Sequence, residues 1–500
     1  MKKSCLFIVI LGFLVFSLAG ISHSWQGRMA GMGDPYGLVA DESDFLFHPA
    51  KIANGKGINF YGGYRFNYTG VTDWNYNLDS FNPAGTLTGF YHYDTSGHEY
   101  RHDGLLGAAF PLGPGRMGLF FEYAGKRGDY DGHEDVLGIS NYADYDLKSK
   151  LDNFALRLLY GLPICGFKMG GEFQLAYRKE QNRNDMPNFL NYTLGTQIPG
   201  RNLTPFQLPY DTSRYWEALL KGSLEGKVGP ADVEFTLKGG FIFSGDNSFE
   251  LTQGNIFLGD NSGDVKGWNI GGDFWLRYPL ANDLSLPFLL RVDYQDKTRD
   301  GVGFRIDGNP NYYPYKSKEQ NLHLEAGGGV NKDFNKGTRI AAGIYYNYLH
   351  GKYNIKLIET TNGLNGQIWD HSNYPASTEH QFMLRLAGEY EISPSVTLRM
   401  GLAPFFGWVR EKFKFTKDNI SYTDDITPDG SHWGIVASLG GTVKFQRFIL
   451  EPFINAGYQK LDLKGDGERV SGGGAISNLW EMDKIKKEWS TGGGFSIKFN

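Results

Sequence analysis

Cysteine is nearly missing from this sequence of 500 residues, which has only Cys5 and Cys165. That scarcity excludes a fold held together by a framework of disulfides. Beyond residue 24, no apolar stretch approaches the roughly 18 residues that a membrane-spanning helix needs. An excess of positive charge is also missing, since 50 Lys and Arg stand against 55 Asp and Glu, with a net charge of −5. The sequence therefore has no basic footprint for nucleic acid, and we expect no such partner.

The first 24 residues form a short apolar leader. Lys2 and Lys3 precede an apolar run that ends near Phe16, and the small residues of a cleavage site follow either at Ser17 and Ala19 or at Ser22 and Ser24. This order is typical of a signal peptide, so we predict that residues 1–24 direct export and are removed. An uncleaved anchor helix is the alternative, although the run is short for a span.

Glycine and aromatic residues are abundant: the chain has 68 Gly, and Phe, Trp and Tyr make up 15% of it. Between residues 58 and 68, apolar side chains such as Ile58, Phe60 and Phe66 alternate with polar ones such as Asn59 and Arg65. Successive side chains of a strand point to opposite faces, so this segment has one apolar and one polar face. The same alternation recurs near residues 167–178, 231–244, 268–278, 284–297, 382–392 and 489–499.

The connections between these segments alternate in length. Short turns such as 111–114, 162–164 and 393–394 separate long polar stretches such as 69–99, 179–213, 351–377 and 410–431, which we expect to be loops. Outer-membrane barrels have short periplasmic turns and longer extracellular loops. We therefore predict an all-β protein: a transmembrane antiparallel up-and-down β-barrel over residues 57–500, in the bacterial outer membrane, with about sixteen strands or alternatively about fourteen. A half-buried sheet in a soluble protein is the competing interpretation.

Charged side chains on the polar faces carry the functional hypothesis. An Arg or Lys that faces lipid at the midplane costs about 2–4 kcal/mol, so we expect these charges to face the lumen. They either pair into a network that stabilises the wall, or leave unpaired Arg residues that tune selectivity. The lumen-facing candidates are Arg65, Glu122, Arg157, Lys168, Glu172, Arg178, Glu234, Lys238, Asp273, Arg277, Arg291, Asp293, Arg339, Arg385, Arg399 and Glu451.

Trp and Tyr residues at the ends of the expected strands form a second set. We expect them in the aromatic girdles that flank the lipid-facing band, with packing in a core as the alternative. They include Tyr68, Tyr123, Tyr177, Trp216, Trp268, Trp408 and Trp489.

Residues 25–56 precede the first strand and are too few for a domain, so they either fold inside the barrel as a plug or lie beneath it. The stretch RMAGMGDPYGLVADESDFLFHPAKIA, residues 28–53, resembles the N-terminal hatch of FadL-type long-chain fatty acid transporters. Asp41 lies in the matching middle part and Pro49 and Ala50 in the matching end, whereas His48 stands where the family has Asn. The resemblance implies a barrel of fourteen strands, a route for hydrophobic molecules, and a plug formed by residues 25–56.

Catalytic and metal-binding signatures are weak. His98 and His102 fit the string H-E-x-x-H, but on a strand they would lie about 13 Å apart, too far to share one metal ion. Acidic stretches near 129–135 and 260–264 lack full calcium-loop spacing, and a nucleophile elbow is absent. We expect no enzyme activity, no cofactor and no metal site, and calcium binding by the acidic loops stays open.

Three functions remain. The main hypothesis is passive diffusion or uptake of small solutes through a polar lumen. The first alternative is a FadL-like transporter of hydrophobic compounds, gated by the N-terminal segment. The second is a structural or partner-binding barrel in the outer membrane. Outer-membrane lipid is the one expected partner, while the cargo and the oligomeric state stay open.

Overall fold

The computed structural model describes residues 27–32, 38–39, 42–136, 141–186, 206–253, 256–307, 309–334, 337–357, 376–417, 422–471 and 476–499. The predicted signal peptide, residues 1–24, and Asp41 of the hatch-like stretch lie outside the described residues.

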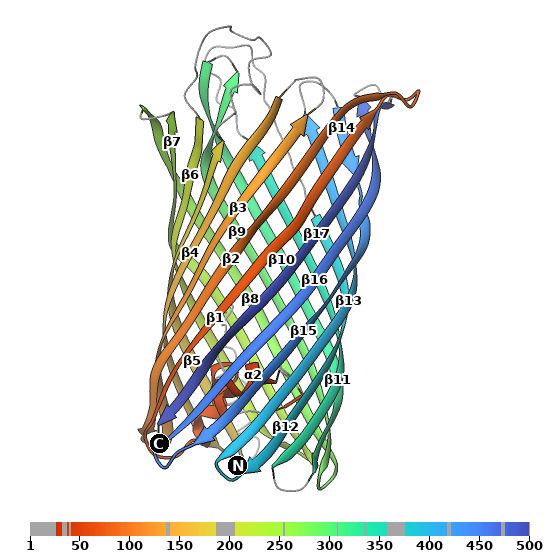
Figure 1. Cartoon of the computed structure of the whole chain (residues 1–500). Helices are drawn as coiled ribbons and strands as arrows, with labels where there is room; N and C mark the ends of the chain where they lie inside the picture. Colours follow the sequence, from red (N-terminus) through yellow and green to blue (C-terminus); the bar gives the residue numbers. More distant parts are fainter. Residues whose placement is uncertain are drawn as a thin grey trace.

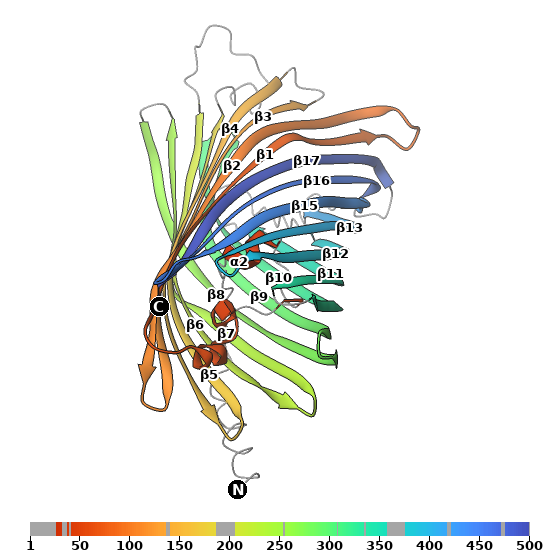
Figure 2. The ribbon, with the colours of Figure 1, turned by 60° about the horizontal axis from the view of Figure 1, so that its bottom comes forward.

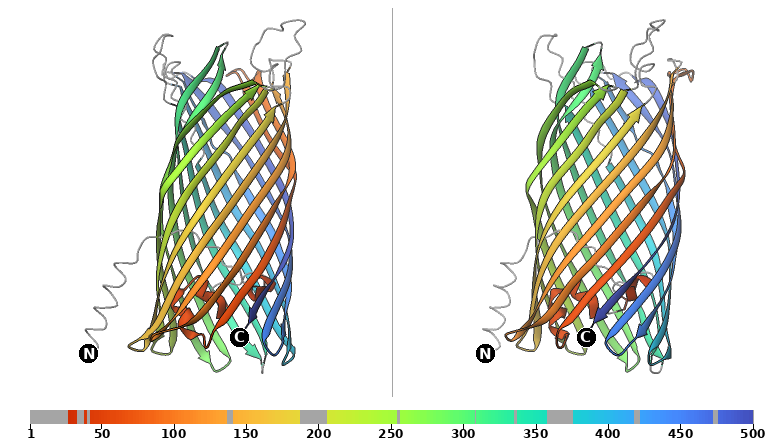
Figure 3. Two further views of the ribbon diagram at one scale, coloured as in Figure 1. Left: turned by 90° about the vertical axis from the view of Figure 1, so that its left-hand side faces the viewer. Right: turned by 60° about the vertical axis from the view of Figure 1, so that its left-hand side comes forward.

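Antiparallel strands make up nearly all of the described chain, and they form one closed sheet because β1 pairs with both β2 and β17 (Figure 1). The two views in Figure 3 show the strands tilted steeply around a tall barrel. The strands are β1 (Asn59–Phe81), β2 (Leu87–Leu112), β3 (Gly115–Val136), β4 (Asn141–Ile164), β5 (Phe167–Met186), β6 (Phe206–Val228), β7 (Ala231–Gln253), β8 (Ile256–Ala281), β9 (Leu284–Asp307), β10 (Asn309–Phe334), β11 (Thr338–Leu357), β12 (Ala376–Ser393), β13 (Val396–Lys417), β14 (Tyr422–Ile426), β15 (Asp429–Lys444), β16 (Phe448–Ser471) and β17 (Ile476–Phe499).

Two of the 17 strands share one position in the wall. On β13, Phe413 faces Ile426 of β14, and Arg410 then faces Asp429 of β15. The neighbour on the other side, β16, pairs with β14 and β15 in the same way. The short β14 and β15 therefore together occupy one strand position of the barrel, interrupted at residues 427–428. The described wall has sixteen strand positions. The predicted up-and-down barrel of about sixteen strands is confirmed, rather than fourteen.

The strands are longer than the alternation predicts. Stretches 69–99 and 410–431, which we expected to be loops, contain the ends of β1, β2 and β13 and the whole of β14. The reason is that backbone pairing continues past the lipid-facing band, where the side chains need no longer alternate between apolar and polar.

The outer face carries the apolar stripe of each strand. Leu106, Ile344 and Met400 are 66%, 64% and 63% exposed, although such side chains are usually buried in soluble proteins. A closed sheet whose outside is apolar suits contact with lipid hydrocarbon, because no unpaired strand edge is left. Among the described residues, no helix is long and apolar enough to cross a membrane.

Tight turns join the strands at one end of the barrel, which we call the short-turn end. Two residues connect β2 to β3, β4 to β5 and β6 to β7, and Gly113, Gly166 and Gly229 in these turns have φ of 57°, 87° and 62°. Such two-residue hairpins require positive φ, which Gly adopts without strain.

Three short helical elements lie inside the barrel near the short-turn end: α2 (Gly27–Gly31), η1 (Glu42–Leu46) and η2 (Pro49–Asn54). Figure 2, with the bottom of the barrel turned toward the viewer, shows them within the ring of strands. We call the described residues between 27 and 54 the plug segment. Leu38 and Ala50 have no exposed surface, and Met32 and Leu46 are 1% exposed, so the plug segment is packed like a protein core.

Candidate functional site: the plug segment and the inner wall

Glycines of the wall let η2 lie directly against it. A Cβ atom added at Gly170 of β5 would lie 2.1 Å from the backbone nitrogen of Ala50, so only Gly fits at that position. The same nitrogen donates a hydrogen bond of 2.6 Å to Oγ of Ser223. On β4, Gly161 leaves room for Ile52. The Pro49–Ala50 step that matches the hatch is therefore held by the backbone of the wall.

Two buried cations of the wall bind the carbonyl oxygen of Leu46. Arg157 donates from Nη2 at 2.5 Å and Lys221 from Nζ at 3.1 Å. Arg157 also pairs with Glu172 at 2.8 Å and with Glu122 at 2.5 Å. Arg157 and Glu172 are 0% and 2% exposed. Buried charges persist only when they are paired and hydrogen-bonded, so this cluster fixes the end of η1 to strands β3–β6.

Lys51 is the buried cation on the plug side. Its Nζ lies 2.9 Å from a carboxylate oxygen of Asp44 and 2.9 Å from one of Glu234 on β7. Burial by itself would lower the pKa of Lys51, but these two carboxylates outweigh burial and raise that pKa above its usual value. Lys51 is therefore charged, and it joins η1, η2 and the wall in one ion cluster.

His48 lies beside that cluster. Its Nδ1 is 2.5 Å from Oγ1 of Thr236, and its Nε2 is 3.6 Å from Glu234. Burial and, second to it, the positive charge of Lys51 lower the pKa of His48 to about 3. The imidazole is thus neutral, which makes it a hydrogen-bonding partner rather than an ion-pair partner at neutral pH. Among the residues with described positions, no group of His, Cys, Asp and Glu is arranged to hold a metal ion.

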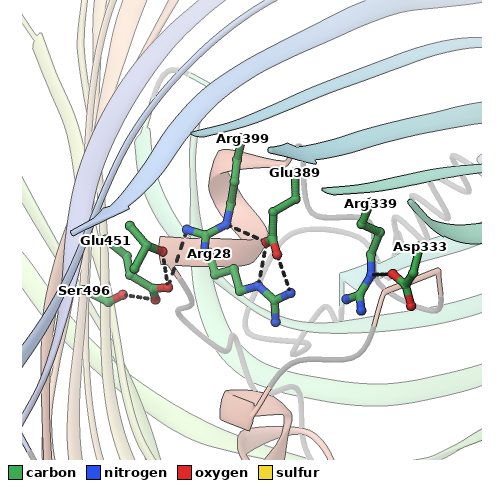
Figure 4. A network of polar contacts seen from close by, with 8 residues as sticks. Arg28, Asp333, Arg339, Glu389, Arg399, Glu451 and Ser496 are labelled. Atoms are coloured by element: carbon green, nitrogen blue, oxygen red, sulfur yellow. Dashed lines mark hydrogen bonds and ion pairs between the residues drawn. The ribbon is translucent and has the colours of Figure 1, made fainter. Parts of the chain in front are cut away.

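An ion pair helps to hold the other end of the plug segment. Arg28 donates from Nε at 3.0 Å and from Nη2 at 3.2 Å to the two carboxylate oxygens of Glu389 on β12 (Figure 4). Glu389 also accepts from Arg399 of β13 at 2.9 Å, and Arg399 lies 3.5 Å from Glu451. This chain of charges links α2 to strands β12, β13 and β16.

Apolar contacts complete the attachment on both sides. Met29, Met32, Leu38 and Val39 pack into one buried cluster with inner-wall residues from β8, β9, β11 and β12. Phe45, Leu46 and Ile52 pack into a second cluster with residues from β2, β3 and β4. The wall residues of the first cluster are Trp275, Leu289, Ala341, Tyr345 and Ala387, and those of the second are Leu105, Ala109, Phe120 and Leu159.

A further polar cluster lies beyond the plug segment, toward the far end of the lumen. Glu180 of β5 pairs with Lys297 at 3.3 Å and Arg299 at 2.5 Å, both on β9. Tyr215 of β6 donates a hydrogen bond of 2.8 Å to Glu180. Since β6, β7 and β8 separate β5 from β9 in the sheet, these side chains bridge across the inner side of the wall.

The sequence-predicted charges occupy the positions that alternate with the exposed apolar side chains, and most have an opposite charge beside them. Glu122, Arg157, Glu172, Glu234, Arg399 and Glu451 belong to the clusters around the plug segment described above. Arg291 pairs with Asp273 at 2.6 Å and also with Glu325, which binds Arg385. Lys238 pairs with Asp293, Lys168 with Glu225, Arg178 with Glu217 and Arg339 with Asp333. Arg277 lies over the ring of Trp275. Arg65 is not without an interaction partner either. Their role in selectivity stays a prediction.

Sequence analysis missed the charges on the plug side. Arg28, Asp44 and Lys51 lie in the hatch-like stretch, but we did not single them out, and Glu389 was not a candidate either. A usable signal was present: a segment expected inside a charged lumen carries two cations and needs acidic partners there. The sequence does not say which acidic residues those are.

No protein-family model matches this chain. No curated protein matches it. Among solved structures, the chain is similar to a FadL homologue of Pseudomonas aeruginosa, with 11% identity, 96% of this chain and 99% of that one covered, and a TM-score of 0.44. A TodX mutant described as a monoaromatic hydrocarbon channel has 12% identity, coverages of 95% and 99%, and a TM-score of 0.46. The toluene transporter TbuX of Ralstonia pickettii has 10% identity, coverages of 95% and 99%, and a TM-score of 0.37.

Proposed function

We propose that this chain is an outer-membrane transporter of hydrophobic compounds, and that the plug segment closes its lumen at the short-turn end. The observation that carries the proposal is the attachment of the plug segment to opposite parts of the wall. Arg157 and Lys221 hold Leu46 on one side, and Glu389 holds Arg28 on the other. A segment fixed on both sides occupies the cross-section that a solute would have to pass.

The state of the inner-wall charges argues against an open aqueous pore. Charges that line a water-filled channel are solvated, whereas Arg157, Glu172 and Lys221 are 0%, 2% and 2% exposed. Near the plug segment, these charges stabilise the closed arrangement instead of filtering ions. This is the pairing network that we weighed against unpaired Arg residues that tune selectivity.

Apolar surface beneath the plug segment favours a hydrophobic cargo. Met29, Met32, Leu38 and Val39 are buried in one cluster with apolar residues of the inner wall, Trp275 and Tyr345 among them. When this part of the plug segment leaves its place, it exposes an apolar patch inside the lumen. A hydrophobic molecule can cover that patch in place of the plug segment, and so offset the roughly 25 cal/mol per Å² lost by exposing it to water. A sugar or an ion cannot.

Placement in the outer membrane follows from the same architecture. The apolar outer face meets lipid, and the short turns lie on the periplasmic side. Export by residues 1–24 belongs to this proposal, as does the absence of enzyme activity.

The test compares two kinds of permeation by the intact protein. The first assay measures the swelling rate of proteoliposomes in small sugars. The second compares the uptake of labelled toluene and labelled palmitate by cells that produce the protein with uptake by cells that carry an empty vector. We expect slow swelling and protein-dependent uptake of at least one hydrophobic compound. Fast swelling with no hydrophobic uptake would establish the polar channel instead. Neither activity, in a barrel that shows heat-modifiable gel mobility, would leave the structural or partner-binding function.

A further inference from the structure

A hollow lies on the outer face of the wall, where β4, β5 and β6 run side by side. Its volume is about 230 Å³, and the surface that borders it is almost wholly apolar. Arg157, Glu172 and Lys221 point into the lumen, so the residues next to them along these strands point outward. The bulky outward side chains around the hollow are those of Leu158, Tyr160, Met169, Phe173 and Leu220.

Facing glycines leave the hollow open. Gly171 of β5 lies opposite Gly222 of β6, and both are at outward positions that border the hollow. On its other side, Gly171 lies opposite Tyr160 of β4. Side chains of facing residues normally cover the backbone between two strands. At this pair no side chain does so, and the backbone of the wall forms the floor of the hollow.

The plug segment touches the inner side of the same floor, because η2 contacts β4, β5 and β6. Gly170 and Ser223 are opposite each other in the sheet register, and both border the hollow. They are also the residues against which Ala50 packs from the lumen. At residues 170–171 the wall has no side chain on either face. A single layer of backbone therefore separates η2 from the hollow.

The hollow lies within the lipid-facing band. Leu158 and Phe173 at its edge are 38% and 43% exposed. Tyr177 and Trp216, whose ring centroids are 5.1 Å apart, lie beyond it on β5 and β6, away from the short turns. Such rings mark the edge of the band. In a membrane, the hollow therefore faces lipid hydrocarbon of the leaflet on the short-turn side.

The lining of the hollow presents hydrocarbon and not charge. Glu172 borders the hollow as well, but its carboxylate points inward and pairs with Arg157. An apolar cavity of about 150 Å³ binds benzene. A hollow of about 230 Å³ accepts a longer stretch of hydrocarbon. Atoms that border an unfilled space lose dispersion contacts, and an acyl chain in the hollow restores them.

We propose that one acyl chain of a phospholipid binds in this hollow and braces the wall behind η2. A chain in the hollow resists outward displacement of the backbone at Gly170 and Gly171, and that backbone is what η2 packs against. Binding of the lipid and attachment of η2 therefore favour each other by one and the same factor. The inference rests on the membrane placement proposed above and is independent of the cargo.

The first test maps the contacts of the lipid. The protein is reconstituted in phosphatidylethanolamine vesicles that contain a trace of the same lipid with a diazirine in one acyl chain. Cross-linked residues are then identified by mass spectrometry. We expect severalfold more adducts on Leu158 and Phe173 than on Leu402 and Phe288, which are outward residues of the same types with nearly the same exposure, 36% and 40%.

A variant that fills the hollow distinguishes this site from general contact with lipid. G171L places a side chain in the hollow, and it should reduce the adducts on Leu158 and Phe173 to the level on Leu402 and Phe288. The matched control is G104L at an outward glycine of β2, where an added Cβ meets nothing closer than 3.9 Å. Heat-modifiable gel mobility reports insertion and folding separately from lipid binding, and M169W replaces G171L if that variant does not fold.

The second test measures the effect on the plug segment. Amide hydrogen exchange of residues 49–54 is compared in vesicles with straight acyl chains and in vesicles with methyl-branched acyl chains, which fit the hollow less well. We expect exchange about fivefold faster with branched chains, the low end of the coupling usual between two sites. G171L should remove this dependence, because its side chain fills the hollow in either lipid, whereas G104L should keep it.

Three results would overturn the proposal. The first is an even distribution of adducts, or the same distribution in G171L and G104L, which would exclude acyl-chain binding in the hollow. The second is equal exchange of residues 49–54 in the two lipids, which would exclude the bracing of η2. The third is cross-linking between two protein chains at the hollow in place of lipid adducts, which would assign it to a second copy of the protein.

Discussion

Replacing Arg28 by Gln tests whether the plug segment gates the lumen. Arg28 is the one charged contact described between α2 and the wall, and its partner Glu389 keeps Arg399 after the change. The loss therefore falls on the attachment of α2 and leaves no unpaired carboxylate in the wall. Arg28 and Glu389 are 19% and 15% exposed, so solvent screens the pair only in part. Hydrogen bonds to charged groups contribute about 1.5–3 kcal/mol, which corresponds to roughly a 10- to 150-fold larger population with α2 detached.

The assay records single channels in planar bilayers and amide hydrogen exchange of residues 27–32. We expect longer and more frequent openings in R28Q, with faster exchange in α2 and unchanged exchange in the strands. The matched control is R339Q, which removes an ion pair to Asp333 in the same region (Figure 4), where the two side chains are 29% and 52% exposed. If R28Q opened no more often than R339Q, the gating role of the plug segment would be refuted.

Three further predictions concern the attachment of η1 and η2. His48 is neutral when buried, with a pKa of about 3, and has its usual pKa of 6.5 once η2 detaches, so attachment is complete above pH 6.5 and weakens as the pH falls toward 3. The free energy of η2 attachment falls by roughly 2 kcal/mol between pH 6.5 and 5. Conductance should therefore rise over this range, and it should rise less in H48Q. An equal rise in H48Q would contradict this prediction. G170A should push η2 off the wall and increase the conductance measured in planar bilayers. G104A is the control, because a Cβ atom added there meets nothing closer than 3.9 Å, and it should leave the conductance unchanged. Equal conductance of the two variants would exclude the close packing of η2 against Gly170. R157M should lower the unfolding free energy by about 3–5 kcal/mol, because it removes a buried cation from Glu122 and Glu172 and leaves Lys221 as the remaining partner of Glu172. K227M, at an exposed pair, should change the unfolding free energy by no more than about 1 kcal/mol. Chemical denaturation followed by gel mobility distinguishes the two variants, and a small effect of R157M would contradict the buried cluster.

The face of each strand residue could be predicted from the sequence because it depends only on parity along the chain. Ile344 points to lipid and Tyr345 to the lumen, whatever strand lies beside them. The same rule predicted the side of Arg157 and Glu172. The barrel and its approximate strand number could also be predicted from the sequence, since short turns and polar stretches recur at regular distances.

The ends of the strands could not be predicted in this way. Apolar alternation marks only the part of a strand in contact with lipid. Beyond it, backbone hydrogen bonds to neighbouring strands decide where pairing stops, and these depend on the register of the whole wall. The split of one wall position into β14 and β15, with residues 427–428 between them, is a consequence of that register.

Chain composition and side-chain period thus determined the fold class, the lipid-facing surface and the presence of a segment that does not belong to the wall. Only the tertiary structure decided what that segment touches. Arg28 and Glu389 are 361 positions apart, and Leu46 meets Lys221 across 175 positions. Such contacts exist only once the sheet has closed into a ring, because closure alone brings distant strands to opposite sides of one narrow interior.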